Sequence, residues 1–67
     1  MIEVYVNGTG RPLNEGTTIA MLVADLGLAP KATLVERNEM ALHRSEWETT
    51  VIGANDRIEF IRIAAGG

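Results

Sequence analysis

The residues with the clearest chemical use stand at the end of the chain, in the run Ala64-Ala65-Gly66-Gly67. Glycine has no Cβ, so a terminal glycine pair fits a narrow channel and leaves the last carbonyl unhindered. We expect the α-carboxylate of Gly67 to be ionised at neutral pH. Nucleophiles do not attack an ionised carboxylate, so another enzyme must activate it, most simply by joining it to AMP from ATP.

We expect the chain to divide into a folded body, residues 1–63, and a flexible tail, residues 64–67. Four extended residues span about 13–14 Å, which is long enough to reach into the active site of a docked partner. In this interpretation Gly67 carries the covalent group, and Gly66 and Ala65 give it access. Gripping the tail costs roughly 1–2 kcal/mol of conformational entropy per residue, so contacts made by the body must offset that loss.

The last predicted strand supplies candidates for those contacts. Its period-two alternation is expected to turn Ile58 and Phe60 toward a helix. The same alternation sends Glu59, Ile61 and Ile63 to the opposite face, beside the tail. We interpret these three residues as docking residues for a partner. For the two isoleucines, packing within a curved sheet remains the alternative.

Composition narrows the other possibilities. The 67 residues include no cysteine and one histidine, and the formal net charge is −3. The lack of cysteine removes disulfides, thiolate metal sites and thiol nucleophiles, and we expect neither a bound metal nor a bound cofactor. The negative net charge disfavours nucleic acid as a binding partner, because nucleic-acid binding needs a basic face. It suits a partner protein with a basic surface. No nucleophile–base pair is visible, so a self-sufficient enzyme is the least favoured interpretation.

The opening residues, Met1 to Val4, lack the basic region and the apolar run of a signal peptide. No apolar segment of the sequence is long enough to span a bilayer. We therefore expect a cytoplasmic location without membrane contact.

The elements that must position the tail follow from hydrophobic periodicity. Alternating apolar residues and turn residues predict strands over 2–6, 11–13, 33–36, 40–42 and 57–63. An apolar stripe at i, i+3, i+4 and i+7 predicts one helix over 19–26. One helix on one face of a mixed sheet of four to five strands buries both apolar surfaces. The predicted class is therefore α+β, with a β-grasp, or ubiquitin-like, fold.

Turn and cap residues mark the ends of these elements. Asn7-Gly8 predicts a tight hairpin, because both residues tolerate positive φ. Thr17 or Thr18 is expected to cap the helix, and Gly27 is expected to end it. These signals agree with the strand and helix boundaries above.

Four further side-chain types have structural interpretations. Pro12 lacks an N–H, so its strand is expected at a sheet edge. Trp47 is expected in the core, and His43 is expected to be solvated. The acidic side chains of the second half are expected to form a mostly solvated face: Glu46, Glu48, Asp56 and Glu59.

The sequence resembles the ThiS family of sulfur carriers in thiamin biosynthesis, and the resemblance runs almost from end to end. No single motif carries it; their order and spacing do. The matching runs are Val6-Asn7-Gly8, Glu15-Gly16-Thr17-Thr18, Leu22-Val23-Ala24-Asp25-Leu26-Gly27-Leu28, Arg44-Ser45-Glu46-Trp47, Asp56-Arg57-Ile58-Glu59 and Gly66-Gly67. The departures are Arg37, Glu39-Met40 and His43, which put the details of the third and fourth strands in question.

The resemblance implies a mechanism and a set of partners. A ThiF-like adenylyltransferase would use Mg-ATP to form an acyl-adenylate at Gly67. A persulfide sulfur donor would displace AMP to give a thiocarboxylate, and a ThiG-like thiazole synthase would take the sulfur. The protein would then be a cosubstrate and not a catalyst.

Three alternatives stay open at this point. A MoaD-like carrier for molybdopterin or another pathway would share the chemistry of the tail. A ubiquitin-like modifier would pass its adenylate to a lysine of another protein. An interaction module would not need its final glycines.

Overall fold

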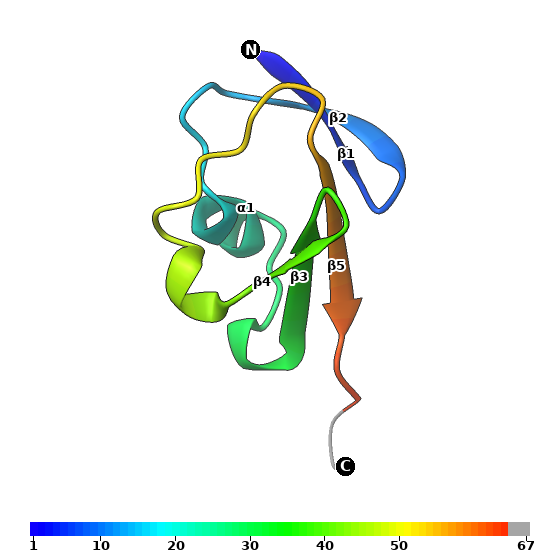
Figure 1. The fold of residues 1–67 in the computed structure, drawn as a ribbon, viewed down its shortest axis with the longest axis vertical. Helices are drawn as coiled ribbons and strands as arrows, with labels where there is room; N and C mark the ends of the chain where they lie inside the picture. Colours follow the sequence, from blue (N-terminus) through cyan, green and yellow to red (C-terminus); the bar gives the residue numbers. More distant parts are fainter. Residues whose placement is uncertain (65–67) are drawn as a thin grey trace.

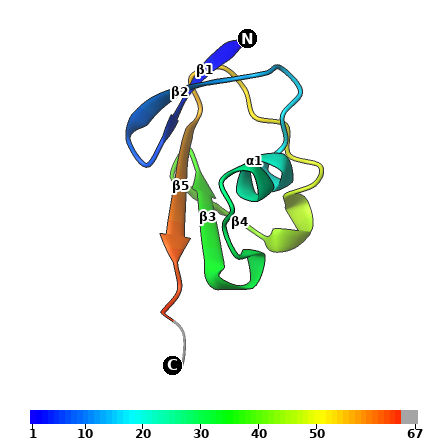
Figure 2. The same ribbon diagram turned by 180° about the vertical axis from the view of Figure 1, so that it is seen from behind.

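The computed structural model describes residues 1–64 and contains a five-stranded sheet with one α-helix against one face (Figures 1 and 2). The sheet order is β2-β1-β5-β3-β4. Only the β1–β5 pair is parallel among the described strands, so the sheet is mixed, as predicted. The elements are β1 (Ile2–Val6), β2 (Thr9–Leu13), α1 (Ile19–Asp25), β3 (Thr33–Arg37), β4 (Met40–Leu42) and β5 (Arg57–Arg62).

The tight hairpin predicted at Asn7-Gly8 joins β1 to β2, but its second strand starts earlier than predicted. Asn7 and Gly8 both have positive φ, 49° and 84°, as a two-residue type I′ turn requires. Strand β2 therefore begins at Thr9, two residues earlier than expected, and Gly10 pairs with Tyr5. The strand lies at the sheet edge, which confirms the inference from its proline.

Helix α1 begins and ends at the signals in the sequence. The hydroxyl of Thr18 accepts a hydrogen bond from the N–H of Met21 at 3.2 Å, so Thr18 is the N-cap. Gly27 has φ 69°, the left-handed conformation that commonly follows a helix. A 3₁₀ turn that was not predicted, η1 (Pro30–Ala32), then leads into β3.

The second half of the sheet also follows the predicted order. Strand β3 runs one residue further than predicted, and β5 stops one residue earlier. Asn38 and Glu39 form the β3–β4 turn with positive φ angles of 51° and 72°. A second 3₁₀ turn, η2 (Arg44–Glu46), delivers Trp47 to the core.

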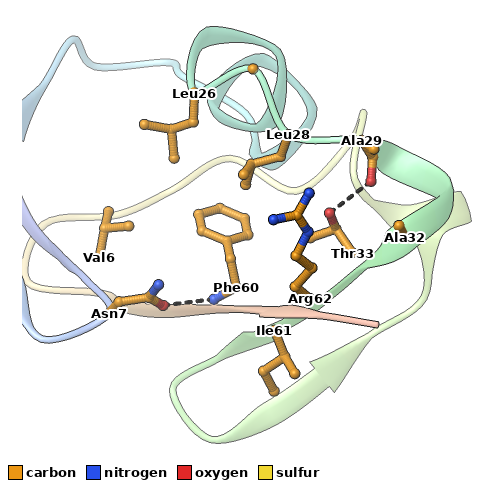
Figure 3. A pocket seen from close by; sticks show the side chains of 11 residues that line it. Val6, Asn7, Leu26, Leu28, Ala29, Ala32, Thr33, Phe60, Ile61 and Arg62 are labelled. Carbon is orange, nitrogen blue, oxygen red and sulfur yellow. Dashed lines mark hydrogen bonds between the residues drawn. The ribbon is translucent and has the colours of Figure 1, made fainter. Parts of the chain in front are cut away.

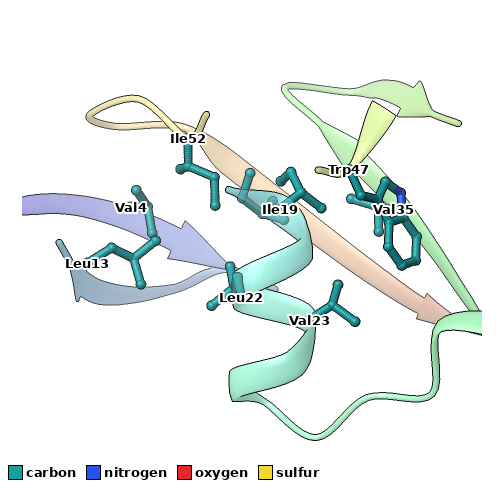
Figure 4. Packing of buried hydrophobic residues seen from close by; sticks show 9 residues of the cluster. Val4, Leu13, Ile19, Leu22, Val23, Val35, Trp47 and Ile52 are labelled. Atoms are coloured by element: carbon teal, nitrogen blue, oxygen red, sulfur yellow. The ribbon is translucent and has the colours of Figure 1, made fainter. Parts of the chain in front are cut away.

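The core lies between α1 and the sheet (Figure 4). Trp47 is only 4% exposed, which confirms its predicted role. Ile52 is 2% exposed, although its segment carried no periodic signal. The buried apolar residues are Val4, Leu13, Ile19, Leu22, Val23, Val35, Trp47, Ile52 and Ile58.

Candidate functional site

The central strand β5 carries the chain out of the fold. After Arg62, one further main-chain hydrogen bond is present within residues 1–64, from the N–H of Ile63 to the carbonyl of Ala32 at 2.8 Å. Ile63 and Ala64 are exposed, and β5 points away from the helix–sheet body (Figure 1). The other predicted tail residues, Ala65, Gly66 and Gly67, lie outside the described residues.

Alternation along β5 divides its side chains as predicted. Ile58 is fully buried, and Phe60 packs partly buried against the core. Glu59, Ile61 and Ile63 are exposed, and the two isoleucines each keep 43% of their surface accessible. The candidate docking residues therefore share one side of the strand that leads to the tail.

The sheet register adds a residue that sequence analysis missed. Leu34 of β3 pairs directly with Ile61 of β5 and is 52% exposed. Cross-strand partners point to the same face, so these two side chains form an apolar pair on the side of the sheet opposite α1. We call Leu34, Glu59, Ile61 and Ile63 the outer patch.

A hollow of about 260 Å³ lies where β5 pairs with β1, near the start of β5. It is lined by Tyr5, Gly8, Arg57 and Glu59. Tyr5 is 40% exposed and pairs with Arg57 across β1 and β5. The outer patch thus continues into a surface with both aromatic and charged side chains.

A larger groove of about 600 Å³ opens where the end of α1 faces β5 (Figure 3). Leu26, Leu28 and Phe60 contribute apolar walls. The side-chain carbonyl of Asn7 accepts a hydrogen bond from the N–H of Phe60 at 2.8 Å. Arg62 is the charged residue among those that line the groove.

Asp56 is buried and joins two loops beside the start of β5, so its predicted place on a solvated acidic face is wrong. Its carboxylate accepts hydrogen bonds from Arg37 Nε at 2.7 Å, the Gly53 N–H at 2.8 Å and Asn38 Nδ2 at 3.0 Å. Burial alone would raise the pKa of Asp56, but the bonds from Gly53, Asn38 and Arg37 outweigh it and lower the pKa. This network also explains Arg37, which stands where an apolar residue was expected.

Residues 1–64 contain no group of three or more His, Cys, Asp or Glu side chains that could hold a metal ion. None of the helices described there is long and apolar enough to cross a membrane. His43 is exposed on the surface, as predicted.

Known proteins resemble the chain in both sequence and structure. A thiazole synthase of Magnetococcus marinus (strain ATCC BAA-1437 / JCM 17883 / MC-1) is 32% identical over 66 residues. That match covers 98% of this chain but only 20% of the relative, so the chain spans a fifth of that protein's length.

Two solved structures of a thiamine biosynthesis protein from Geobacter metallireducens have the same fold. The crystal structure, of the protein named ThiS, gives a TM-score of 0.85 at 26% identity and covers 98% of this chain and 100% of its own. The solution structure gives a TM-score of 0.80 at 26% identity, with coverages of 98% and 88%. These likenesses confirm the predicted β-grasp fold.

The family comparison agrees with the fold and with the motifs near both ends of the chain. Residues 4–67 match the model of the ThiS family, which is nearly the whole sequence. The chain therefore belongs to the ThiS family.

Proposed function

We propose that this chain is a sulfur carrier of thiamine biosynthesis whose reactive group is the carboxylate of Gly67. The observation that carries the proposal is the course of β5, which leaves the sheet at Arg62 and continues through exposed Ile63 and Ala64. Membership of the ThiS family and the likeness to a thiamine biosynthesis protein support it. Residues 1–63 would form the body, and residues 64–67 would form the tail.

The chemistry needs an activating enzyme. In the proposal a ThiF-like adenylyltransferase uses Mg-ATP: a carboxylate oxygen of Gly67 attacks the α-phosphorus, pyrophosphate leaves, and an acyl-adenylate forms. A persulfide sulfur then attacks the acyl carbon and AMP leaves. A thiol cleaves the resulting acyl disulfide, which releases the thiocarboxylate. The chain is a cosubstrate in every step, and ATP and Mg²⁺ belong to the partner.

The proposed sulfur acceptor is a ThiG-like thiazole synthase. The support is the relative named thiazole synthase, which is similar to 98% of this chain over a fifth of its own length. A carrier domain and the enzyme that consumes its sulfur would then be linked in that relative. We propose that this chain donates its sulfur to a thiazole synthase of the same kind.

The outer patch is the proposed docking surface. Leu34, Ile61 and Ile63 together expose apolar area close to the tail. Burial of apolar surface contributes roughly 25 cal/mol per Å², which can offset the entropy lost when the tail is gripped. Glu59 stands on the same face and suits a basic residue of the partner.

Intact-mass spectrometry tests the carrier chemistry. The chain is incubated with the ThiF-like enzyme from the same genome, Mg-ATP, a persulfide donor and a thiol. We expect the mass gain of one oxygen replaced by one sulfur, and no gain when ATP is omitted. A variant extended beyond Gly67 should stay folded and show no gain, because its reactive carboxylate is displaced.

Two results would contradict the proposal. The first is an unchanged mass with an enzyme that demonstrably converts another carrier. The second is sulfur transfer by the extended variant at the same rate as by the normal chain. An isopeptide adduct in a cell extract would instead favour the protein-modifier alternative, and transfer to a molybdopterin precursor would favour the MoaD-like one.

A further inference from the structure

Strand β5 extends well beyond the end of β1, its neighbour on one side of the sheet. The β1–β5 register joins Tyr5 to Arg57 and Val6 to Ile58, and β1 then ends in the hairpin turn. On its other side β5 stays paired with β3 as far as Arg62. Both ribbon views show β5 running past the tip of the β1–β2 hairpin (Figures 1 and 2). The second half of β5 therefore has a free edge in the part of the chain that the structure describes.

The direction of the main-chain N–H and C=O groups shows which of them are unpaired at this edge. The N–H of Ile63 bonds to η1, on the β3 side, and the N–H of Phe60 bonds to the Asn7 side chain, on the β1 side. Main-chain groups of successive strand residues point alternately to the two sides. The N–H of Arg62 and the carbonyl of Phe60 hence face the β1 side, where neither has a hydrogen-bond partner within residues 1–64.

The apolar groove lies beside the same edge. Phe60 and Arg62 line it from β5, while Leu26 and Leu28 line it from the end of α1 (Figure 3). Arg62 is its charged residue and makes no ion pair within residues 1–64. The edge thus combines one free main-chain donor, one free main-chain acceptor, an apolar groove of about 600 Å³ and one cation.

We propose that the free edge of β5 binds an extended segment of the activating enzyme by strand addition. The segment continues the line of β1, bonds to Phe60 and Arg62 through its main chain, and inserts one apolar side chain into the groove. A carboxylate of the segment pairs with Arg62. This inference rests on the proposed function, because the activating enzyme is the partner, and it assigns that enzyme a second contact besides the outer patch.

Strand geometry specifies the segment further. Side chains on one face of a strand recur every second residue, about 6.5–7 Å apart. An apolar residue seated between Leu28 and Phe60 is therefore followed or preceded, two positions away, by the acidic residue that meets Arg62. Main-chain bonds give such a complex its affinity, and the alternate side chains give it specificity. The expected pattern is apolar-x-acidic.

Residue-resolved amide exchange tests the strand addition without relying on activity. The ¹⁵N-labelled chain is studied by NMR alone and in complex with the ThiF-like adenylyltransferase. We expect the Arg62 amide to exchange at least about tenfold more slowly in the complex, because its N–H gains an acceptor. The amide of Val51, a residue that lines neither the groove nor the outer patch, should be unaffected and serves as the internal control.

A charge reversal tests the proposed pairing. Arg62→Glu is compared with Arg44→Glu, which makes the same charge change on exposed η2, a turn that contributes no residue to the groove. We expect Arg62→Glu to weaken the complex about tenfold and Arg44→Glu to change it by less than about twofold. Arg62→Lys should keep most of the affinity.

The outcomes separate this inference from the proposed function. If the wild-type chain is converted to a thiocarboxylate while Arg62 exchange is unchanged in the complex, the strand addition is wrong and the carrier function stands. Equal effects of Arg62→Glu and Arg44→Glu would overturn the ion pair. If no thiocarboxylate forms with an active enzyme, the carrier function fails, and the inference that depends on it fails too.

Discussion

Asp56 shows how one residue can hold the sheet and its loops together. Its carboxylate bonds to Gly53 in its own loop and to Arg37 and Asn38 at the β3–β4 turn. The side-chain carbonyl of Asn38 in turn accepts a hydrogen bond from the N–H of Arg57 at 2.9 Å. The start of β5 is thus fixed to the end of β3 through one buried anion.

We predict that this network makes stability depend on pH below neutrality. The folded state lowers the pKa of Asp56, so its stabilisation is present above the unfolded-state pKa, about 3.9, and is lost as pH falls through the lower folded value. Asp56→Asn should destabilise the fold by about 2 kcal/mol at pH 7. The difference from wild type should shrink below about pH 4 in urea unfolding followed by circular dichroism.

Glu48→Gln provides the matched control for this experiment. Glu48 is exposed and makes no side-chain hydrogen bond or ion pair within the described residues. Its substitution should change the unfolding free energy by less than about 0.5 kcal/mol at every pH. A constant difference between Asp56→Asn and wild type down to pH 2 would contradict the proposed linkage.

Residue-level prediction from sequence succeeded where a local pattern carried the information. Trp47 is a large aromatic and Ile58 follows a clear alternation, and both are buried as predicted. Ile52 lies in an irregular segment without periodicity, so its burial could not be predicted. Asp56 and Arg37 are 19 positions apart, and only the tertiary fold makes them partners.

At the scale of elements, helix α1 has only seven residues, and its stability depends on the capping interactions at its two ends. Isolated helices of this length are marginal in water, so packing and capping must stabilise it. The Thr18 hydroxyl satisfies the N–H of Met21, and the Leu28 N–H bonds back to the carbonyl of Val23 past the turn at Gly27. These local signals explain why the helix was predicted within one residue.

We predict that Thr18→Ala lowers the unfolding free energy by about 1 kcal/mol, because the first turn loses its cap. For a domain of this size the melting temperature should fall by about 4–8 °C. Thr18→Ser keeps the hydroxyl and should recover most of the loss. If Thr18→Ser were as unstable as Thr18→Ala in thermal unfolding, the β-branched methyl group, and not the cap, would be responsible.

Two elements show the limits of local prediction. Strand β2 begins at Thr9 because a two-residue turn brings the chain straight back, whereas the apolar alternation predicted this strand only from residue 11. The turn η1 was not predicted, although Pro30 stands at its first position. Proline is common there because its fixed φ suits a helical turn and the missing N–H would be unpaired in any case.

At the scale of the molecule, the β3–β5 pair and the residue that follows it bring three exposed apolar side chains together next to the tail: Leu34, Ile61 and Ile63. Sequence alternation was enough to predict that Ile61 faces away from the helix and that Ile63, just past the end of β5, is exposed. Leu34 could not be added from the sequence, because its place beside Ile61 depends on the antiparallel β3–β5 register. The outer patch is therefore a product of topology as much as of sequence pattern.

We predict that Leu34→Ser weakens the complex with the ThiF-like adenylyltransferase by about 1–2 kcal/mol, which corresponds to about five- to thirtyfold in Kd. The reason is that Leu34, 52% exposed in the free chain, would be covered by the partner. Val51→Ser is the matched control, since Val51 is 53% exposed but belongs to the segment that bridges to Thr18. Titration calorimetry measures both, after circular dichroism has verified that each variant is folded.

The control also distinguishes docking at the outer patch from nonspecific binding through any exposed apolar side chain. Both substitutions remove one half-exposed aliphatic side chain, and each should change stability by less than about 0.5 kcal/mol. If the outer patch docks the enzyme, only Leu34→Ser raises Kd. In that variant the Gly67 carboxylate is adenylated more slowly at low carrier concentration and at the normal rate at saturation. Equal losses for the two variants would mean that the partner does not distinguish the β5 face from the rest of the molecule, and the outer patch would no longer explain how the tail reaches its enzyme.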